Sequence, residues 1–297
     1  MSSSPSSPVY SSAASTGFTA PYLPAFTSRY FRLSQSAFVI SDYLVRKFRL
    51  AESVLLTSLC YWHEFVAAHG GRKVNEVVLA TTCVFLAAKV EHAHIRLARL
   101  VEAAFDLDVS TTSPAELEQW CRSVLDVELV LCDTIHFDFV RIFPLADTLR
   151  SVQTLSDAGQ VSDAVAREIT TAVRRVFLFS FVAPLCTKVS MQRLCTSILC
   201  MIVTASRREL VPLLQPAWSV PEAEYPEEAE LEGITAVLMD IFAYLHKRFG
   251  VPSLDDVNEA RYRRRRSQQR GNDAGIVSSV FSSASTDFTP LMKMSEQ

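Results

Sequence analysis

Residues 77–101, VVLATTCVFLAAKVEHAHIRLARLV, constrain the fold more than any other stretch of this sequence. The run begins almost without charge, and Lys89 and Glu91 then interrupt it near the end of its most apolar part. A helix that is apolar on every side is expected in the middle of a helical domain. Because unpaired charge is costly to bury, we expect these two charges to emerge at a surface or to contact a partner.

The composition is that of an ordinary globular protein. A length of 297 residues is enough for about two domains, and a formal net charge of −3 gives no overall attraction for a nucleic acid. The seven cysteines lie mainly in apolar runs, as is typical of proteins in a reducing compartment. No apolar window approaches the roughly 20 residues that a bilayer requires. The first basic residue is Arg29, which argues against a signal or transit peptide. We therefore expect an intracellular protein.

The first half of the chain shows a series of segments with helical spacing. The pair Gly70 and Gly71 is expected to end the second of them. Ser113 as N-cap, Pro114 at the first position and Glu116 in the first turn together begin another helix well. The expected helices are 30–49, 51–68, one from about 74, 95–105, 113–134, and 139–152, which completes the first unit.

A similar pattern begins again after the turn-rich residues 156–162. The expected helices are 163–185, a second very apolar helix at 189–209, and 229–248, which Gly250 closes; an exposed acidic loop, 221–232, precedes the last of them. Alternating strand patterns are not evident, so the fold class is all-α. We expect two tandem five-helix repeats at 28–153 and 154–250, between disordered tails at 1–27 and 251–297.

Both tails carry short motifs. The Ser- and Pro-rich N-terminal tail contains Ser4-Pro5 and Ser7-Pro8, which are either sites for a proline-directed kinase or part of a passive tail. The C-terminal tail contains a basic run that is a candidate nuclear-import signal, with a nucleic-acid patch and a solvated helix flank as the alternatives. Its basic residues are Arg261, Arg263, Arg264, Arg265 and Arg266.

Enzyme motifs are lacking in this sequence. It has no Gly-rich phosphate loop, no Gly-x-Ser-x-Gly elbow and no His-Glu-x-x-His motif. Cys60 with His63, and Cys132 with His136, have spacings that place each pair on one helix face, but neither pair has the further ligands of a structural zinc site. We therefore expect no catalytic residues, no metal and no cofactor.

A family resemblance rests on short motifs in both halves. The segment 85–91, FLAAKVE, resembles the centre of a cyclin box, and 128–131, ELVL, followed by FDF at 137–139, resembles the second landmark of that family. In the second half, FSF at 179–181, LCT at 185–187 and the apolar residues 194–205 are similar to the second repeat of cyclins C, K, L and T. The resemblance covers about 30–249.

The resemblance implies a function that spacing alone does not. From spacing, Lys89 and Glu128 on separate helices are two surface charges. In the resemblance they match the box lysine and glutamate, which pair in cyclins and present hydrogen bonds to the kinase backbone near its mobile helix. Together with Phe85, Glu91 and His92 they form the expected kinase-binding set. The implied protein is a non-catalytic subunit, in the nucleus or also in the cytoplasm, that binds a cyclin-dependent Ser/Thr kinase as a heterodimer and activates it in transcription. Further subunits of a transcription complex are its other expected partners.

Three departures from the family pattern matter. The acidic pair that usually follows the box lysine is Glu91-His92 here. The charge in the His-Arg-Phe motif of cyclins K and T is reversed by Glu64. Residues 33–40 lack the substrate-docking motif of cell-cycle cyclins, which favours the transcription-type branch.

Two alternatives remain open at this point. One is a cell-cycle cyclin, and the other is a protein like general transcription factor B, whose two five-helix repeats engage promoter DNA. The second alternative needs a basic face across the repeats, whereas the basic run here lies in the tail.

Overall fold

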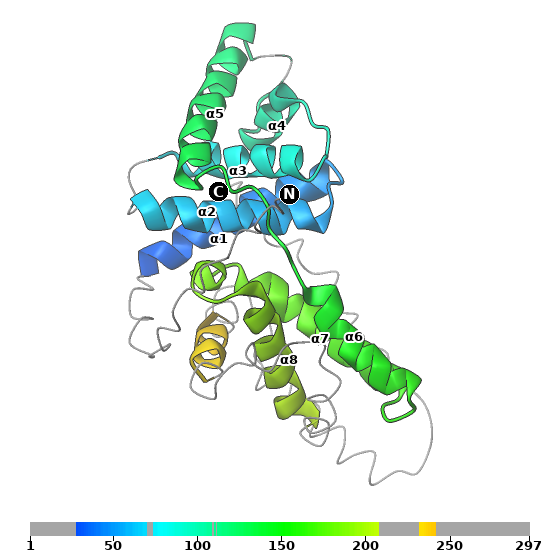
Figure 1. The fold of residues 1–297 in the computed structure, drawn as a ribbon. Coiled ribbons are helices and arrows are strands. Elements are labelled where there is room, and N and C mark those ends of the chain that lie inside the picture. Colours follow the sequence, from blue (N-terminus) through cyan, green and yellow to red (C-terminus); the bar gives the residue numbers. More distant parts are fainter. Residues whose placement is uncertain (1–27, 70–73, 109, 111, 208–231, 242–297) are drawn as a thin grey trace, which may run out of the picture.

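The computed structural model describes residues 28–69, 74–108, 110, 112–207 and 232–241. This part of the chain is all-α and contains no strand (Figure 1). None of its helices is long and apolar enough to cross a membrane. The elements are α1 (Ser28–Lys47), α2 (Glu52–His69), α3 (Glu76–Val90), α4 (Leu97–Ala104), α5 (Pro114–Thr134), α6 (Leu145–Asp157), α7 (Asp163–Ser180), the 3-10 helix η2 (Pro184–Thr187) and α8 (Met191–Arg207), with a further helix at 232–241.

Most of the apolar stretch 77–101 forms α3, the central helix of the first group, and its last five residues begin α4. Helix α3 packs against α1, α2, α4 and α5, and every residue from Val78 to Ala88 is buried. Asn75 caps its N-terminus, since the Asn75 side chain accepts hydrogen bonds from the backbone N–H groups of Val77 and Val78. Because α3 is buried on all faces, it has no polar side, and the charge of Lys89 comes only in its last turn.

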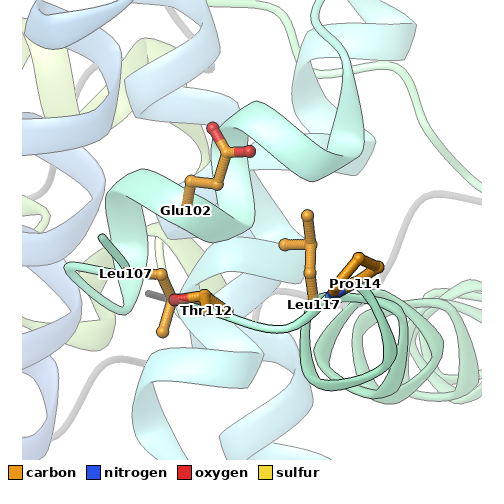
Figure 2. Close-up of a pocket in the computed structure, with 5 residues that line it drawn as sticks. All are labelled: Glu102, Leu107, Thr112, Pro114 and Leu117. Atoms are coloured by element: carbon orange, nitrogen blue, oxygen red, sulfur yellow. The ribbon is translucent and has the colours of Figure 1, made fainter. Parts of the chain in front are cut away.

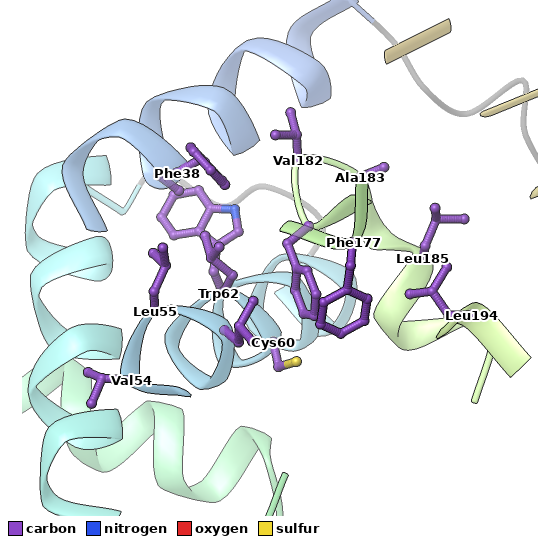
Figure 3. Packing of buried hydrophobic residues seen from close by; sticks show 14 of the residues in the cluster. Phe38, Val54, Leu55, Cys60, Trp62, Phe177, Val182, Ala183, Leu185 and Leu194 are labelled. Atoms are coloured by element: carbon purple, nitrogen blue, oxygen red, sulfur yellow. The ribbon is translucent and has the colours of Figure 1, made fainter. Parts of the chain in front are cut away.

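Helix α2 joins the two halves of the molecule. Its residues from Val54 to His63 are all buried, and it contacts both α3 and η2. Figure 3 shows side chains of α1, α2 and α7 converging, among them Phe38, Trp62 and Phe177. The buried hydrophobic residues of both halves form one continuous cluster, so the halves share a core.

One expected helix begins later than predicted, because the segment 138–144 is not helical. We predicted a helix at 139–152, but α6 begins only at Leu145, and the residues before it are extended (Figure 1). Pro144 occupies the N-cap position, where its missing N–H is tolerated. Helix α6 packs against α7 and α8, so it lies with the second group of helices and not with the first, where the sequence analysis placed it.

The other expected helices are present with shifted ends, and of the helix expected at 229–248 only 232–241 lies within the described residues. The expected helix 163–185 ends at Ser180, because the chain turns at 181–183 and then forms η2. The helix predicted at 113–134 is α5, with Ser113 as its N-cap. The predictions for the two tails, for the basic run at 261–266 and for the acidic loop at 221–232 fall almost wholly outside the described residues.

Candidate partner-binding site

Lys89 lies in the last turn of α3, at the point where the buried helix reaches the surface. The side chains of the preceding turns anchor the helix, and Phe85, one turn earlier, is buried. The chain then leaves α3 at Glu91, whose backbone N–H donates to the carbonyl of Ala87. The rigid helix therefore fixes where the lysine side chain starts, and its ammonium group reaches the surface.

Glu128 on α5 pairs with Lys89. Nζ of Lys89 donates hydrogen bonds to Oε1 of Glu128 at 2.7 Å and to Oε2 at 2.9 Å. The same ammonium group lies over the Phe85 ring, 4.1 Å from its centroid. The pairing that the resemblance implied is thus present, and the cation is held by a carboxylate and by an aromatic face.

The two partners differ in exposure, and this difference has a chemical consequence. The Lys89 side chain is 48% exposed and the Glu128 side chain only 12%. An ammonium group has three donors, of which Glu128 engages two. The pair therefore presents an oriented donor at the surface, and a backbone carbonyl of a partner protein is a suitable acceptor.

Glu91 and His92 do not join this pair in one cluster. Oε1 of Glu91 accepts a hydrogen bond of 2.9 Å from the hydroxyl of Thr57 on α2, which ties the end of α3 to its neighbour. His92 is exposed and has a left-handed backbone with φ of 56°. This conformation ends the helix in a tight turn, with the His92 N–H donating to the carbonyl of Lys89. Of the five predicted residues, the structure joins Phe85, Lys89 and Glu128.

Exposed apolar side chains form a surface on α5 and beyond it that was not predicted from the sequence. Leu129 is 73% exposed, and Leu125, Val130 and Phe137 are also exposed. Exposed apolar residues in one region are typical of an interaction site. The sequence feature that could have indicated this surface is the run 127–131 in α5, which is more apolar than a helix packed on one side requires. The sequence alone does not show which of these residues face outward.

Glu64, the charge-reversed position, has a partner in the extended segment that follows α5. Nη2 of Arg141 donates to both carboxylate oxygens of Glu64 at 2.8 Å, and the guanidinium group lies 5.4 Å from the centroid of the Tyr61 ring. Burial alone would lower the pKa of Arg141, but the carboxylate of Glu64 raises it above its usual value. The acidic residue therefore fastens the segment 138–144 to α2.

Two polar groups of α2 make similar links. The Tyr61 hydroxyl donates to the carbonyl of Phe139 at 2.6 Å. Nε2 of His63 donates to the carbonyl of Phe181 at 2.7 Å, which joins α2 to the turn after α7. His63 is fully buried, and this burial lowers its pKa to about 4. His63 is thus a neutral structural donor that joins the two halves of the molecule.

The described residues contain no group of three or more side chains suited to a metal ion. A pocket opens between α4 and the start of α5, and Figure 2 shows the five residues that line it. They are Glu102, Leu107, Thr112, Pro114 and Leu117. This lining offers one carboxylate and no nucleophile with a base beside it. The paired charges at the end of α3 are therefore the stronger candidate site.

Comparison with known proteins agrees with this arrangement. Residues 37–139 match the family described as "Cyclin, N-terminal domain", and this range includes Lys89 and Glu128 but not Arg141, Phe177 or Phe181. Residues 37–139 are thus similar to a cyclin N-terminal domain, and the resemblance to the transcription-type cyclins is confirmed in this part of the chain.

The relatives are matched over part of their length. Cyclin-C of Rattus norvegicus is 28% identical over 116 residues, 38% of this chain and 41% of that protein. Cyclin-T2 of Mus musculus is 26% identical over 137 residues, 43% of this chain and 19% of that protein. Cyclin-C of Drosophila melanogaster is 23% identical over 135 residues, 44% of this chain and 51% of that protein. The chain therefore matches about half or less of the length of these relatives.

A solved structure extends the likeness to the second half. A chain in the structure of the CAK complex from Chaetomium thermophilum bound to ATP-gamma-S superposes with a TM-score of 0.51, at 15% sequence identity, over 87% of this chain and 86% of that chain. At this level of identity the likeness shows the fold alone. The described residues thus form an all-α fold like that of the matched chain, and the family match to cyclins covers 37–139 of it.

Proposed function

We propose that this protein is a cyclin that binds and activates a cyclin-dependent Ser/Thr protein kinase. The observation that carries the proposal is the Lys89–Glu128 pair, which holds an oriented donor at the surface at the end of the buried helix α3. The exposed apolar residues of α5, of which Leu129 is the most exposed, lie on the helix that supplies Glu128. A polar anchor beside apolar surface is the usual composition of a protein interface.

The proposed mechanism is allosteric and requires no catalytic residue in this chain. A protein kinase is active only when the helix that carries the Glu partner of its ATP-site Lys is in place. A subunit that binds this state preferentially shifts the kinase population toward it. Moving the ratio from 1:99 to 99:1 requires a difference in binding of roughly 5.5 kcal/mol. An interface of an obligate complex, on the order of 2,000 Å² or more, supplies such a difference.

Three finer statements belong to the same proposal. The second group of helices, α6 to α8, forms a second cyclin-like repeat, which the likeness of the fold over most of the chain supports. The kinase acts in transcription, because the named relatives Cyclin-C and Cyclin-T2 are transcription-type cyclins. The protein works in the nucleus, for which the basic run at 261–266 is the candidate import signal.

The alternative of a promoter-binding protein fits the described surface less well. Contacts to phosphates require Lys and Arg on the binding face. The exposed part of α5 carries Asp126 and Asp133, and its one arginine, Arg122, is paired with Glu118.

The experiment that tests the proposal is purification of the tagged full chain from its own cells, with identification of the bound proteins and a protein kinase assay. We expect one cyclin-dependent kinase in stoichiometric amount and activity that depends on the chain. Recovery of promoter DNA or polymerase subunits without a kinase would refute the proposal and favour the promoter-binding alternative.

A further inference from the structure

The outward side of α5 is an acidic and apolar surface that extends beyond the Lys89–Glu128 pair. We define the α5 outer face as five exposed residues: Leu125, Asp126, Leu129, Val130 and Asp133. Their spacings of three and four place them on one side of the helix. The buried residues Val124, Glu128 and Leu131 of the same helix lie on the other side, toward the core.

The charge of this face is negative and is not neutralised within the described part of the chain. Asp126 and Asp133 have no ion-pair partner there. Arg122 on the same helix is engaged by Glu118, and Lys89 is engaged by Glu128. Asp138, just beyond the helix, is 73% exposed but is paired with Arg141 at 3.4 Å, so it adds no unpaired charge to this face.

We propose that the α5 outer face selects a kinase whose docking surface alternates apolar side chains with Lys or Arg. The apolar side chains of such a partner cover Leu125, Leu129 and Val130, and its cations meet Asp126 and Asp133. This inference rests on the proposed function, and it adds the charge that the kinase must carry. A second copy of this chain does not fit, because two acidic faces repel each other.

Electrostatic complementarity acts mainly on the rate of association and on the choice of partner. Exposed charges are screened by salt, so the contribution of Asp126 and Asp133 must fall as ionic strength rises. The apolar contacts are not weakened by salt in this way. The proposal therefore predicts that the kinase binds rapidly and that its binding is sensitive to salt. Both properties should be lost when Asp126 and Asp133 are replaced by residues of opposite charge.

The test compares two double variants of the full chain that change the net charge equally. The test variant is Asp126→Lys/Asp133→Lys, and the control is Asp157→Lys/Asp240→Lys, at exposed positions at the end of α6 and in the helix 232–241. Association with the kinase that co-purifies with the wild-type chain is measured at low and at high salt. We expect the test variant to associate about tenfold more slowly at low salt and to lose most of the salt dependence, with the control unchanged.

Other outcomes separate this inference from the proposed function. If a kinase binds and the test variant associates like the control, the charge proposal is overturned and the function stands. A third outcome is that the test variant and a chain lacking 251–297 both bind the kinase faster than the wild type. This would show that the basic run at 261–266 covers the α5 outer face, and the charge proposal would be overturned. If no kinase is recovered, the proposed function is refuted. The docking proposal for the α5 outer face is then tested with a synthetic amphipathic peptide of Leu and Lys. Salt-sensitive binding of that peptide to the wild type and not to the test variant supports the surface; equal binding refutes it.

Discussion

At the scale of single residues, the most informative feature is the unequal exposure of Lys89 and Glu128. Glu128 is nearly buried, and its carboxylate is satisfied by the lysine, whereas the ammonium group is half exposed. Exposure keeps the ammonium group hydrated, which limits its desolvation cost, and leaves it accessible to a partner. The geometry is what a binding site requires, since the buried partner sets the position of the exposed one.

Replacement of Lys89 tests this residue directly. We expect Lys89→Ala to reduce kinase binding about tenfold or more, because the carboxylate loses its partner and the kinase loses a donor. The loss of stability should be roughly 1 to 3 kcal/mol, because Glu128, only 12% exposed, is left without its partner. Binding and thermal unfolding are measured in parallel, with the exposed Lys188→Ala as the control. Equal binding by both variants would remove Lys89 from the interface. Glu128→Ala is expected to have the same effect on kinase activation.

His63 gives a pH dependence of stability. Its pKa is lowered to about 4 in the folded protein by burial, from an ordinary value of 6.5. Between these values the unfolded chain binds a proton that the folded protein does not, so the free energy of unfolding falls as the pH falls from 6.5 toward 4. The full slope of one such group is about 1.4 kcal/mol per pH unit.

The variant His63→Asn serves as the comparison, because its amide can still donate a hydrogen bond to the Phe181 carbonyl. We expect urea unfolding of the wild type to show a steeper loss of stability between pH 6.5 and 4 than the variant shows. Parallel curves for the two proteins would mean that His63 does not cause the effect.

At the scale of elements, α2 and the extended segment 138–144 determine how the halves are joined. On α2, Glu64 forms an ion pair with Arg141, and the Tyr61 hydroxyl donates to the Phe139 carbonyl. His63 donates to the Phe181 carbonyl. The departure of Glu64 from the usual family motif thus has a structural reason, since it is matched by an arginine in the segment that leads into α6. The Arg141 side chain is only 15% exposed, so this pair is shielded from solvent much more than Lys89 is.

The contribution of the Glu64–Arg141 pair is measured with a double-mutant cycle. We expect Arg141→Met to destabilise the protein by about 2 kcal/mol, because it leaves a partly buried carboxylate without its bidentate partner. Glu64→Gln should cost a similar amount, and the double variant less than the sum. Arg150→Ala, at an exposed pair with Asp147, is the control and should change stability by less than about 0.5 kcal/mol. Additive changes in the cycle would show that the pair is not coupled.

At the scale of the whole molecule, the two groups of helices share one hydrophobic core. Phe181 is buried against Phe143 and Phe177, with ring centroids 6.0 Å and 5.2 Å away. Phe38 of α1 lies 6.4 Å from Phe179, so the first helix also contacts the second half. A surface for a partner on the first half is therefore supported by packing that extends into the second.

A shared core predicts cooperative unfolding. We expect the full chain to unfold in a single calorimetric transition and Phe181→Ala to move the whole transition to lower temperature, with a loss of roughly 3 to 5 kcal/mol. Phe137→Ala, at an exposed ring, is the matched control and should leave the transition nearly in place. Two transitions, of which Phe181→Ala moves only one, would contradict a common core.

The sequence by itself determined the features that depend on neighbouring residues. The uniform apolarity of 77–88 predicted a central buried helix, and Ser113 with Pro114 predicted the start of α5, because caps and first-turn residues act locally. The family motifs located the paired lysine and glutamate. Pro144 did not reveal the start of α6, since its N-cap position depends on how the preceding extended segment is held.

Only the tertiary structure decided how these parts meet. Lys89 and Glu128 lie 39 positions apart, and their contact depends on the packing of α3 against α5. Packing also decides that Leu131 is buried while Leu129 is 73% exposed, although both belong to one apolar run. Glu64 meets Arg141 for the same reason, across 77 positions. Local sequence sets the helices, whereas the burial that creates a surface or a site is a property of helices packed together.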